Sequence, residues 1–405
     1  MNIYLLSREK NAPVWDGYDR CLLDSLWDFT TFHNVYNLLD MDPNNISDNI
    51  LILLLKNDLY ELESKTKSIE KCNNKRIIVL YHYKCLSAPN GYKSLEYDRQ
   101  LLIDKLGFQP QNILYITQLK PDQQHVRNVF GPLVKVTYFD KWLEEMNRYQ
   151  IKPSFKNAQN HFAKNNLRPD KKFSLLIRRY EDVRLEVMCE LISKNLLDDF
   201  YYTFAARGGY EAEDIGKQLS NYLNNLPERY RPHHDKILQW AKGIPYEAET
   251  IGPGQTEIYD MFFSMNLGNY CNHCKIMVVL ETHFHDTDPK RSDHSIITEK
   301  TYRAMLYKKP FIIISQHGTL ATLRECGYKT FGHVINESYD HVENVDTKLN
   351  LISTELDRIR KLDDKELQYL LDACQENIEH NYNLLLKESF RTIPKEYSIP
   401  YFINS

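Results

Sequence analysis

Apolar residues occur in short runs along the first 150 residues, and amphipathic stretches separate these runs. The runs have strand length and lie at 2–6, 49–55, 76–81, 112–117 and 135–138. In the intervening stretches, apolar residues recur at helical spacing over 21–39, 60–70, 95–106 and 141–149. Continuous apolar strands that alternate with helices are typical of parallel sheets, because both faces of such sheets are covered. The pattern predicts an α/β fold with a doubly wound parallel sheet.

The same alternation restarts near residue 173. Strands are predicted at 173–177, 200–204, 275–280 and 310–314, and helices at 183–194, 211–224, 256–265, 298–307 and 363–388. The alternation lapses over 147–172, where polar residues and two prolines take over. We therefore expect two Rossmann-like domains facing across a cleft. The predicted boundaries are an N-terminal domain at 1–150, a linker at 151–172, a second domain at 173–390 and a tail at 391–405.

The predicted linker is strongly basic. From Asn147 to Tyr180 the chain carries nine Lys or Arg residues and one acid, Asp170. Aromatic residues at 149, 155, 162 and 173 interleave with this charge, as on surfaces that neutralise phosphates and stack on bases. A solvated hinge has the same composition, so both interpretations stay open. The candidate contacts to nucleic acid are Lys152, Lys156, Lys164, Arg168, Lys171 and Lys172.

The overall composition limits the classes of protein to consider. Lys and Arg total 51 against 55 Asp and Glu, a formal charge of −4, so any basic site has to be local. The longest apolar run, 50–55, is far shorter than the ~20 residues of a membrane-spanning helix. Eight scattered cysteines do not form a disulfide scaffold, and no G-x-G-x-x-G or Walker A pattern occurs. We expect a cytoplasmic protein without a membrane span.

The stretch from 296 to 320 carries the most chemistry. Thr298 suits a helix N-cap, and the helix that it opens places free backbone N–H groups and a positive dipole end beside Glu299, Lys300 and Arg303. Such a helix end binds phosphate, and a carboxylate at the same place can accept hydrogen bonds from both hydroxyls of a ribose. One helical turn therefore offers contacts for both parts of a nucleotide.

The run I-T-E-K-x-Y-x-A-x-x-x-x-x-P-F-I starts at Ile297, and the pattern continues to Asp340. It resembles the nucleotide-sugar half of GT-B glycosyltransferases, in particular a set from bacteriophages and marine viruses, and more distantly the fucosyltransferases. The resemblance covers about residues 275–340, with weaker support from Phe173 onward. It implies that Glu299 binds the donor ribose and that Lys300 binds the diphosphate. No motif in the first half of the chain allows a similar transfer.

Further residues at strand ends extend this donor site. Arg178, Arg179 and Arg184 resemble the arginines of the family's donor domain, and the departing diphosphate needs compensating positive charge. Arg207 and Tyr210 flank a glycine pair after the strand at 200–204, where donor contacts form in such a fold, although a plain turn explains them equally. The predicted donor-binding set is Thr298, Glu299, Lys300, Arg303, Arg178, Arg179, Arg184, Arg207 and Tyr210.

Transfer to a hydroxyl also needs a general base. The loop after the first strand, 7–19, is long and rich in carboxylates and aromatic residues. Asp16 lies between Trp15 and Gly17 and is the first choice, with Asp19 and Glu9 as alternates. A neighbouring apolar ring can raise the pKa of a carboxyl into a useful range. An ordinary surface loop remains the other interpretation.

Two other patterns suggest metals. Asp286-Thr287-Asp288 follows a strand and spells the D-x-D that holds a divalent ion in GT-A enzymes. Cys271 and Cys274, with His283 and His285, contain four zinc-ligand types, but the strand between the pairs would have to turn back sharply. We instead expect Cys274 to pack in the core, the histidines to line a loop, and the reaction to need no obligatory metal or cofactor.

These observations favour a glycosyltransferase that moves a sugar from a nucleoside diphosphate sugar, in first place a UDP-sugar, to a hydroxyl. The favoured acceptor is 5-hydroxymethylcytosine in double-stranded phage DNA, as the resemblance to viral arabinosyl- or glucosyltransferases implies, which would place the protein in the host cytoplasm. The basic strip would then lie along phosphates beside a flipped base. Two alternatives remain: a glycan or protein acceptor at the cell surface, and a non-catalytic nucleic-acid-binding protein on a transferase fold.

Overall fold

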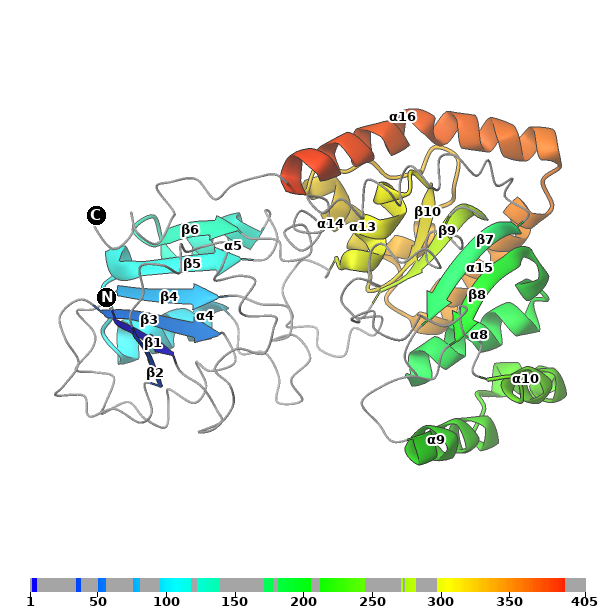
Figure 1. The fold of residues 1–405 in the computed structure, drawn as a ribbon, viewed down its shortest axis with the longest axis horizontal. Helices are drawn as coiled ribbons and strands as arrows, with labels where there is room; N and C mark the ends of the chain where they lie inside the picture. Colours follow the sequence, from blue (N-terminus) through cyan, green and yellow to red (C-terminus); the bar gives the residue numbers. More distant parts are fainter. Residues whose placement is uncertain are drawn as a thin grey trace. The chain divides into compact units, whose positions relative to one another are not determined.

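The computed structural model describes residues 2–5, 34–37, 50–55, 76–80, 95–117, 122–138, 171–177, 181–204, 212–244, 271, 274–281 and 297–389. The chain divides into two compact units. Unit 1 comprises residues 1–145, 288–294 and 390–405, and unit 2 comprises 146–287 and 295–389. Each unit contains one parallel sheet (Figure 1).

Unit 1 is built on a six-stranded sheet in the order β2-β1-β3-β4-β5-β6, with every neighbouring pair parallel. The strands are β1 (Asn2–Leu5), β2 (Asn34–Asn37), β3 (Ile50–Leu55), β4 (Arg76–Leu80), β5 (Ile113–Thr117) and β6 (Lys135–Tyr138). The helical elements described in this unit are α4 (Leu95–Arg99), the π-helical η7 (Gln100–Lys105), the short η8 (Pro110–Asn112) and α5 (Asp122–Phe130). All five residues of β5 are buried, as expected of a strand covered on both faces.

Two elements of unit 1 differ from the sequence-based expectation. The predicted helix at 21–39 is wrong at its end, because β2 occupies Asn34–Asn37 and pairs in parallel with β1. Val35 and Tyr36 favour a strand once an edge is available for pairing. α5 was not predicted, since it is polar apart from Val126 and Phe130, which lie one turn apart and are buried. The predicted helices at 60–70 and 141–149 lie outside the described residues.

Unit 2 is built on a four-stranded parallel sheet in the order β10-β9-β7-β8. The strands are β7 (Lys171–Ile177), β8 (Phe200–Phe204), β9 (Cys274–Leu280) and β10 (Phe311–Ile314). The helical elements are α8 (Asp182–Ser193), η9 (Leu197–Asp199), α9 (Ala212–Asn224), η10 (Glu228–His233), α10 (His234–Ala241), α13 (Glu299–Leu306), α14 (Thr319–Glu325), η11 (Ser338–His341), α15 (Val345–Arg360) and α16 (Asp364–Ser389). The predicted helix at 256–265 lies outside the described residues.

Both sheets share a strand order that identifies a ligand-binding edge. Counted within unit 2, the strands run 2-1-3-4, and unit 1 extends the same order to six strands. The chain leaves β7 toward β8 on one side and later enters β9 on the other, so the sheet has its switch point between β7 and β9. Ligands bind open α/β sheets outside the carboxyl ends of the strands at such a point. The predicted fold class is confirmed: the chain is α/β, with two Rossmann-like units, the architecture of the GT-B class.

Candidate functional site

The candidate site of unit 2 lies where β9 ends and α13 begins. Glu281 follows β9 directly, and its backbone N–H donates to the carbonyl of Ile314 at 3.0 Å, so it continues the pairing with β10. Its side chain is buried. The carboxylate accepts hydrogen bonds from the first turn of α13, which places that turn at the carboxyl end of the sheet, beside the switch point.

Thr298 caps α13 as predicted from the sequence. Its backbone is extended, and its hydroxyl oxygen accepts the N–H of Lys300 at 3.4 Å. The same oxygen also accepts the Lys300 ammonium at 3.2 Å. The N-cap prediction is therefore confirmed, and the cap holds both the backbone and the side chain of Lys300.

The expectation of free backbone N–H groups at this helix end is wrong for two of them. The N–H of Thr298 donates to Glu281 Oε1 at 3.1 Å, and the N–H of Lys300 is taken by the Thr298 hydroxyl. The physical reason is the buried carboxylate of Glu281, which satisfies the helix end from inside the protein. Positive charge for an anionic ligand therefore has to come from side chains more than from these amides.

Glu299 is buried, with a relative exposure of 7%. Its Oε1 lies 3.0 Å from the ammonium of Lys300. Its Oε2 is buried and has no hydrogen-bond partner among the residues that the structure describes. Burial alone raises the pKa of this carboxyl, but the positive charges of Lys300 and Arg303 outweigh burial and hold the pKa below its ordinary value. Glu299 is thus an ionised carboxylate with one oxygen ready to accept hydrogen bonds.

Two arginines of the predicted donor set are described, and both are buried. Arg303 lies one turn along α13 from Glu299, and its charge contributes to the lowered pKa of that carboxyl. Arg184 lies in the first turn of α8, the helix that follows β7 in the chain, and pairs with Glu181 at 3.1 Å. The four remaining predicted donor contacts, Arg178, Arg179, Arg207 and Tyr210, lie outside the described residues.

Sequence reasoning missed Glu281, although a signal was available. An acidic residue that directly follows an apolar strand of a parallel sheet lies at the edge where ligands bind. Attention went instead to Asp286 and Asp288 a few residues later, which lie outside the described residues. The base candidates Asp16, Asp19 and Glu9 also lie outside them.

The predicted basic strip is described only at its end, where β7 begins within the expected linker. The ammonium of Lys171 donates to the carbonyl of Asp198 at 2.6 Å. The ammonium of Lys172 donates to the carbonyls of Arg360 and Leu362, the latter at 2.9 Å. Both side chains bind backbone within unit 2, and their contact with DNA stays a prediction. The other four, Lys152, Lys156, Lys164 and Arg168, lie outside the described residues.

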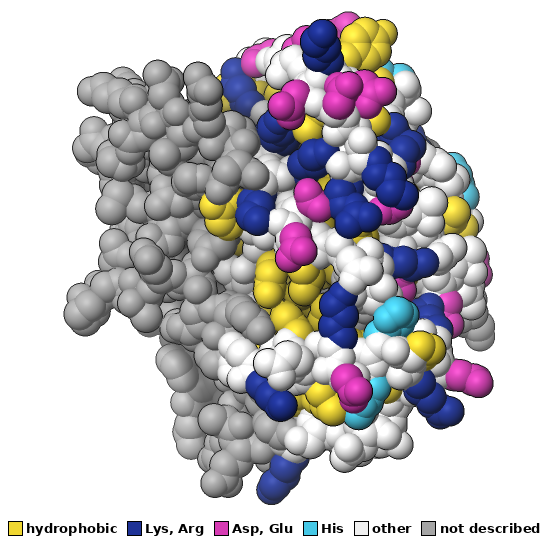
Figure 2. All heavy atoms as spheres, turned by 90° about the vertical axis from the view of Figure 1, so that its right-hand side faces the viewer, with side chains coloured by type: hydrophobic (Ala, Val, Ile, Leu, Met, Phe, Trp, Pro, Cys, Tyr) yellow, Lys and Arg dark blue, Asp and Glu magenta, His cyan; other side chains and the backbone are white. Residues whose placement is uncertain are grey.

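The surface of unit 2 adds no separate basic strip on the face drawn in Figure 2. There, Lys and Arg side chains are interspersed with Asp and Glu over the described residues. Examples are the pairs Arg360–Asp357 at 2.6 Å and Lys308–Glu379 at 2.8 Å. Mixed charge of this kind is what a solvated surface shows.

The cysteine pair behaves as core. Cys271 and Cys274 are buried, and the Cys274 thiol lies 3.1 Å from the hydroxyl of Ser174, which confirms the expected packing of Cys274. Burial raises the pKa of Cys271 to about 12, so its thiol is neutral at neutral pH. His283 and His285 lie outside the described residues, within which no group of three or more metal-ligand side chains occurs. Among the described helices, none has the length and apolar character to cross a membrane.

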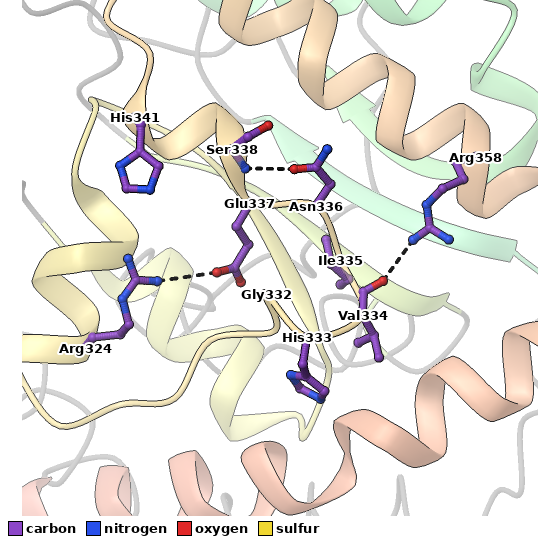
Figure 3. Close-up of a pocket in the computed structure, with 10 residues that line it drawn as sticks. All are labelled: Arg324, Gly332, His333, Val334, Ile335, Asn336, Glu337, Ser338, His341 and Arg358. Atoms are coloured by element: carbon purple, nitrogen blue, oxygen red, sulfur yellow. Dashed lines mark hydrogen bonds and ion pairs between the residues drawn. The ribbon is translucent and has the colours of Figure 1, made fainter.

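A second cavity, of about 620 Å³, is lined by the loop at 332–338 and the ends of α14 and α15 (Figure 3). Its charged groups are tied to one another. Glu337 accepts the N–H of Phe331 at 2.6 Å, the Thr330 hydroxyl at 2.9 Å and Arg324 at 3.4 Å. A Cβ at Gly332 would come within 2.9 Å of Glu337 Oε2, so this position needs glycine. The cavity reads as a braced loop rather than a prepared site.

Comparison with known proteins adds the following. No protein-family model and no curated protein sequence matches the chain. Among solved structures, it is similar to trehalose-6-phosphate synthase OtsA (13% identity, TM-score 0.38, 98% of this chain and 76% of the other). It is also similar to Anabaena Alr3699/HepE in complex with UDP-glucose (10%, TM-score 0.45, 96% and 98%) and to trehalose-6-phosphate from E. coli bound with UDP-2-fluoro glucose (14%, TM-score 0.37, 96% and 80%). At this level of similarity, these structures assign no residue a role.

Proposed function

We propose that this chain is a glycosyltransferase that takes a sugar from a nucleoside diphosphate sugar, and that unit 2 holds the donor nucleotide. The observation that carries the proposal is the carboxylate of Glu299 at the carboxyl end of the sheet. One of its oxygens is buried without a partner among the described residues, and the other is paired with Lys300. Buried polar atoms are almost always hydrogen-bonded, so an orphaned oxygen in this position indicates a missing donor.

Ribose hydroxyls fit that donor. Two neighbouring hydroxyls can both bond a carboxylate, and a charged acceptor strengthens each bond. The lowered pKa of Glu299 keeps this acceptor ionised at neutral pH. In this arrangement, Lys300 and Arg303 lie on the same helix as the ribose acceptor and supply positive charge near the diphosphate.

The reaction then proceeds by attack of an acceptor hydroxyl on the anomeric carbon of the sugar. The bond from that carbon to the diphosphate oxygen breaks, and the diphosphate leaves with the electron pair. The hydroxyl proton passes to a general base, for which Asp16 is the first candidate. Side-chain cations stabilise the charge that develops on the leaving group, which is where electrostatic stabilisation contributes most.

For the acceptor, we propose the hydroxymethyl group of a modified cytosine in double-stranded DNA. The support is the basic and aromatic composition of 147–180 and the resemblance to viral transferases. If the strip contacts phosphates, log K for DNA should fall with log salt with a slope of about −0.9 per phosphate neutralised. Reversing the charges of Lys152, Lys156 and Lys164 should flatten this slope and leave nucleotide affinity unchanged. A glycan acceptor, which the net charge of −4 favours, predicts no salt-sensitive DNA binding.

The donor proposal is tested by thermal unfolding with a panel of UDP- and GDP-sugars. A sugar nucleotide present at 100 times its Kd should stabilise the wild-type protein by about 2.7 kcal/mol. Glu299→Ala should abolish most of this stabilisation. Glu376→Ala is the matched control, because Glu376 is an exposed glutamate of α16 that pairs with Lys329. If no sugar nucleotide stabilises the wild-type protein, or if both variants respond as it does, the assignment of Glu299 is wrong.

A further inference from the structure

We infer that Glu281 is the positioning residue of this site: it holds the Thr298 hydroxyl and the first turn of α13 in the arrangement that presents Glu299 and Lys300 to the nucleotide. The inference rests on the proposed function and assigns a role to a residue that contacts no reacting atom. It is carried by the hydrogen bonds of one buried carboxylate.

Glu281 is almost completely buried, with a relative exposure of 1%. Its Oε1 accepts the N–H of Thr298 at 3.1 Å and the hydroxyl of Thr301 at 2.6 Å. Its Oε2 accepts the hydroxyl of Thr298 at 2.5 Å. These three bonds join the end of β9 to positions seventeen and twenty residues further along the chain. A buried carboxylate is costly unless several donors satisfy it, and here the donors all come from the first turn of α13.

The bonds also fix the direction of the Thr298 hydroxyl. A carboxylate only accepts, so the hydroxyl hydrogen of Thr298 points to Glu281. The lone pairs of the same oxygen then face the N–H of Lys300 at 3.4 Å and its ammonium at 3.2 Å. That ammonium lies 3.0 Å from Glu299 Oε1. A continuous chain of polar contacts therefore runs from Glu281 through Thr298 and Lys300 to Glu299.

The charge of Glu281 matters in this chain, as well as its shape. A glutamine can keep an oxygen at the Oε1 position, which preserves the bonds from the Thr298 N–H and the Thr301 hydroxyl. Its amide N–H₂ would then face the Thr298 hydroxyl, whose oxygen would have to accept from it in addition to Lys300. We therefore expect a graded series, in which Glu281→Gln impairs the site less than Glu281→Ala.

The test is calorimetric binding of UDP and of GDP, each used alone, to full-length variants whose folding is verified by circular dichroism. For whichever nucleotide the wild-type protein binds, Glu281→Ala should raise Kd at least tenfold and Glu281→Gln by a smaller factor. Glu355→Gln is the matched control, because Glu355 is a buried glutamate that bonds the N–H of Asn336 at 3.0 Å. It should leave Kd within twofold. If Glu281→Ala does not fold, Thr301→Val removes one of the three bonds and should raise Kd at least threefold.

A double-mutant cycle separates positioning from general destabilisation. If Glu281 acts through Glu299 and Lys300, adding Glu281→Gln to Glu299→Ala should change Kd by less than twofold, because the group being positioned is already gone. A further loss as large as in the wild-type background would overturn the inference. So would Glu281 variants that bind like the Glu355→Gln control.

The two levels of the argument fail differently. If the wild-type protein binds neither UDP nor GDP, the proposed donor site is wrong and this inference falls with it. If the wild-type protein binds and Glu299→Ala weakens binding, but the Glu281 variants bind normally, only the positioning role is wrong.

Discussion

Replacing Glu299 by leucine is the perturbation that best separates a ligand-binding carboxylate from a structural one. The side chain is 9% exposed and is paired with Lys300, whose own side chain is 22% exposed and reaches water. Removing the carboxylate costs the fold this ion pair but also removes a buried oxygen that has no partner among the described residues. An unsatisfied buried polar group costs about 1–3 kcal/mol, similar to what a hydrogen bond to a charged group contributes. The two effects offset each other, so Glu299→Leu should change the free energy of unfolding by less than about 1 kcal/mol.

Donor binding should respond very differently. Hydrogen bonds from a ribose to a charged acceptor are worth about 1.5–3 kcal/mol. Glu299→Leu should therefore raise the donor Kd by roughly ten- to a hundredfold. In the wild-type protein, donor affinity should stay level from pH 8 to about pH 5. The pKa of Glu299 is depressed in the folded protein, so its charge is lost only below the ordinary carboxyl value of about 4.3.

The matched control is Glu355→Leu on α15. Glu355 is also buried, but both of its oxygens have partners: Oε1 accepts Asn336 N–H at 3.0 Å and Oε2 accepts Arg358 Nε at 2.8 Å. Losing these bonds strands the Asn336 N–H, so this variant should lower the free energy of unfolding by about 1–3 kcal/mol and leave donor affinity unchanged. Denaturant unfolding and calorimetry measure the two quantities. The reasoning is refuted if Glu299→Leu destabilises the protein as much as Glu355→Leu does while the donor Kd stays at the wild-type value.

Three further predictions concern the chemistry. Lys300→Ala should lower turnover more than it weakens nucleotide binding, because its charge matters most as the diphosphate departs; equal small losses in steady-state kinetics and calorimetry would indicate a structural role. Transfer should persist in excess EDTA, whereas complete loss that Mn²⁺ or Mg²⁺ reverses would favour a metal site at Asp286 and Asp288. Asp16→Asn should abolish transfer and keep donor binding, since an amide cannot take up the acceptor proton; full activity in a product assay would move the role to another residue.

Local pattern was enough to predict most of the sheet strands. Runs such as 113–117 and 274–280 are apolar on both faces, which only a covered parallel strand requires, so their place in the sheet follows from their own residues. The start of α13 was equally readable, because an N-cap acts on N–H groups two or three residues away and its signal is contained in one turn. Pairing with a distant strand decided β2, whose four residues carry too little pattern to outweigh the helical spacing before them.

The chemistry of the site divides along the same line. Glu299 and Lys300 could be chosen from the motif, because their roles depend on neighbours in the same helical turn. That Glu299 is an orphaned acceptor, and that Glu281 takes the helix-end N–H of Thr298, depends on how β9 is placed against α13. Seventeen residues separate Glu281 from Thr298, and hydrogen bonds act only over about 3 Å. Only the folded sheet brings such groups within that distance, so this part of the site could not be read from residue order.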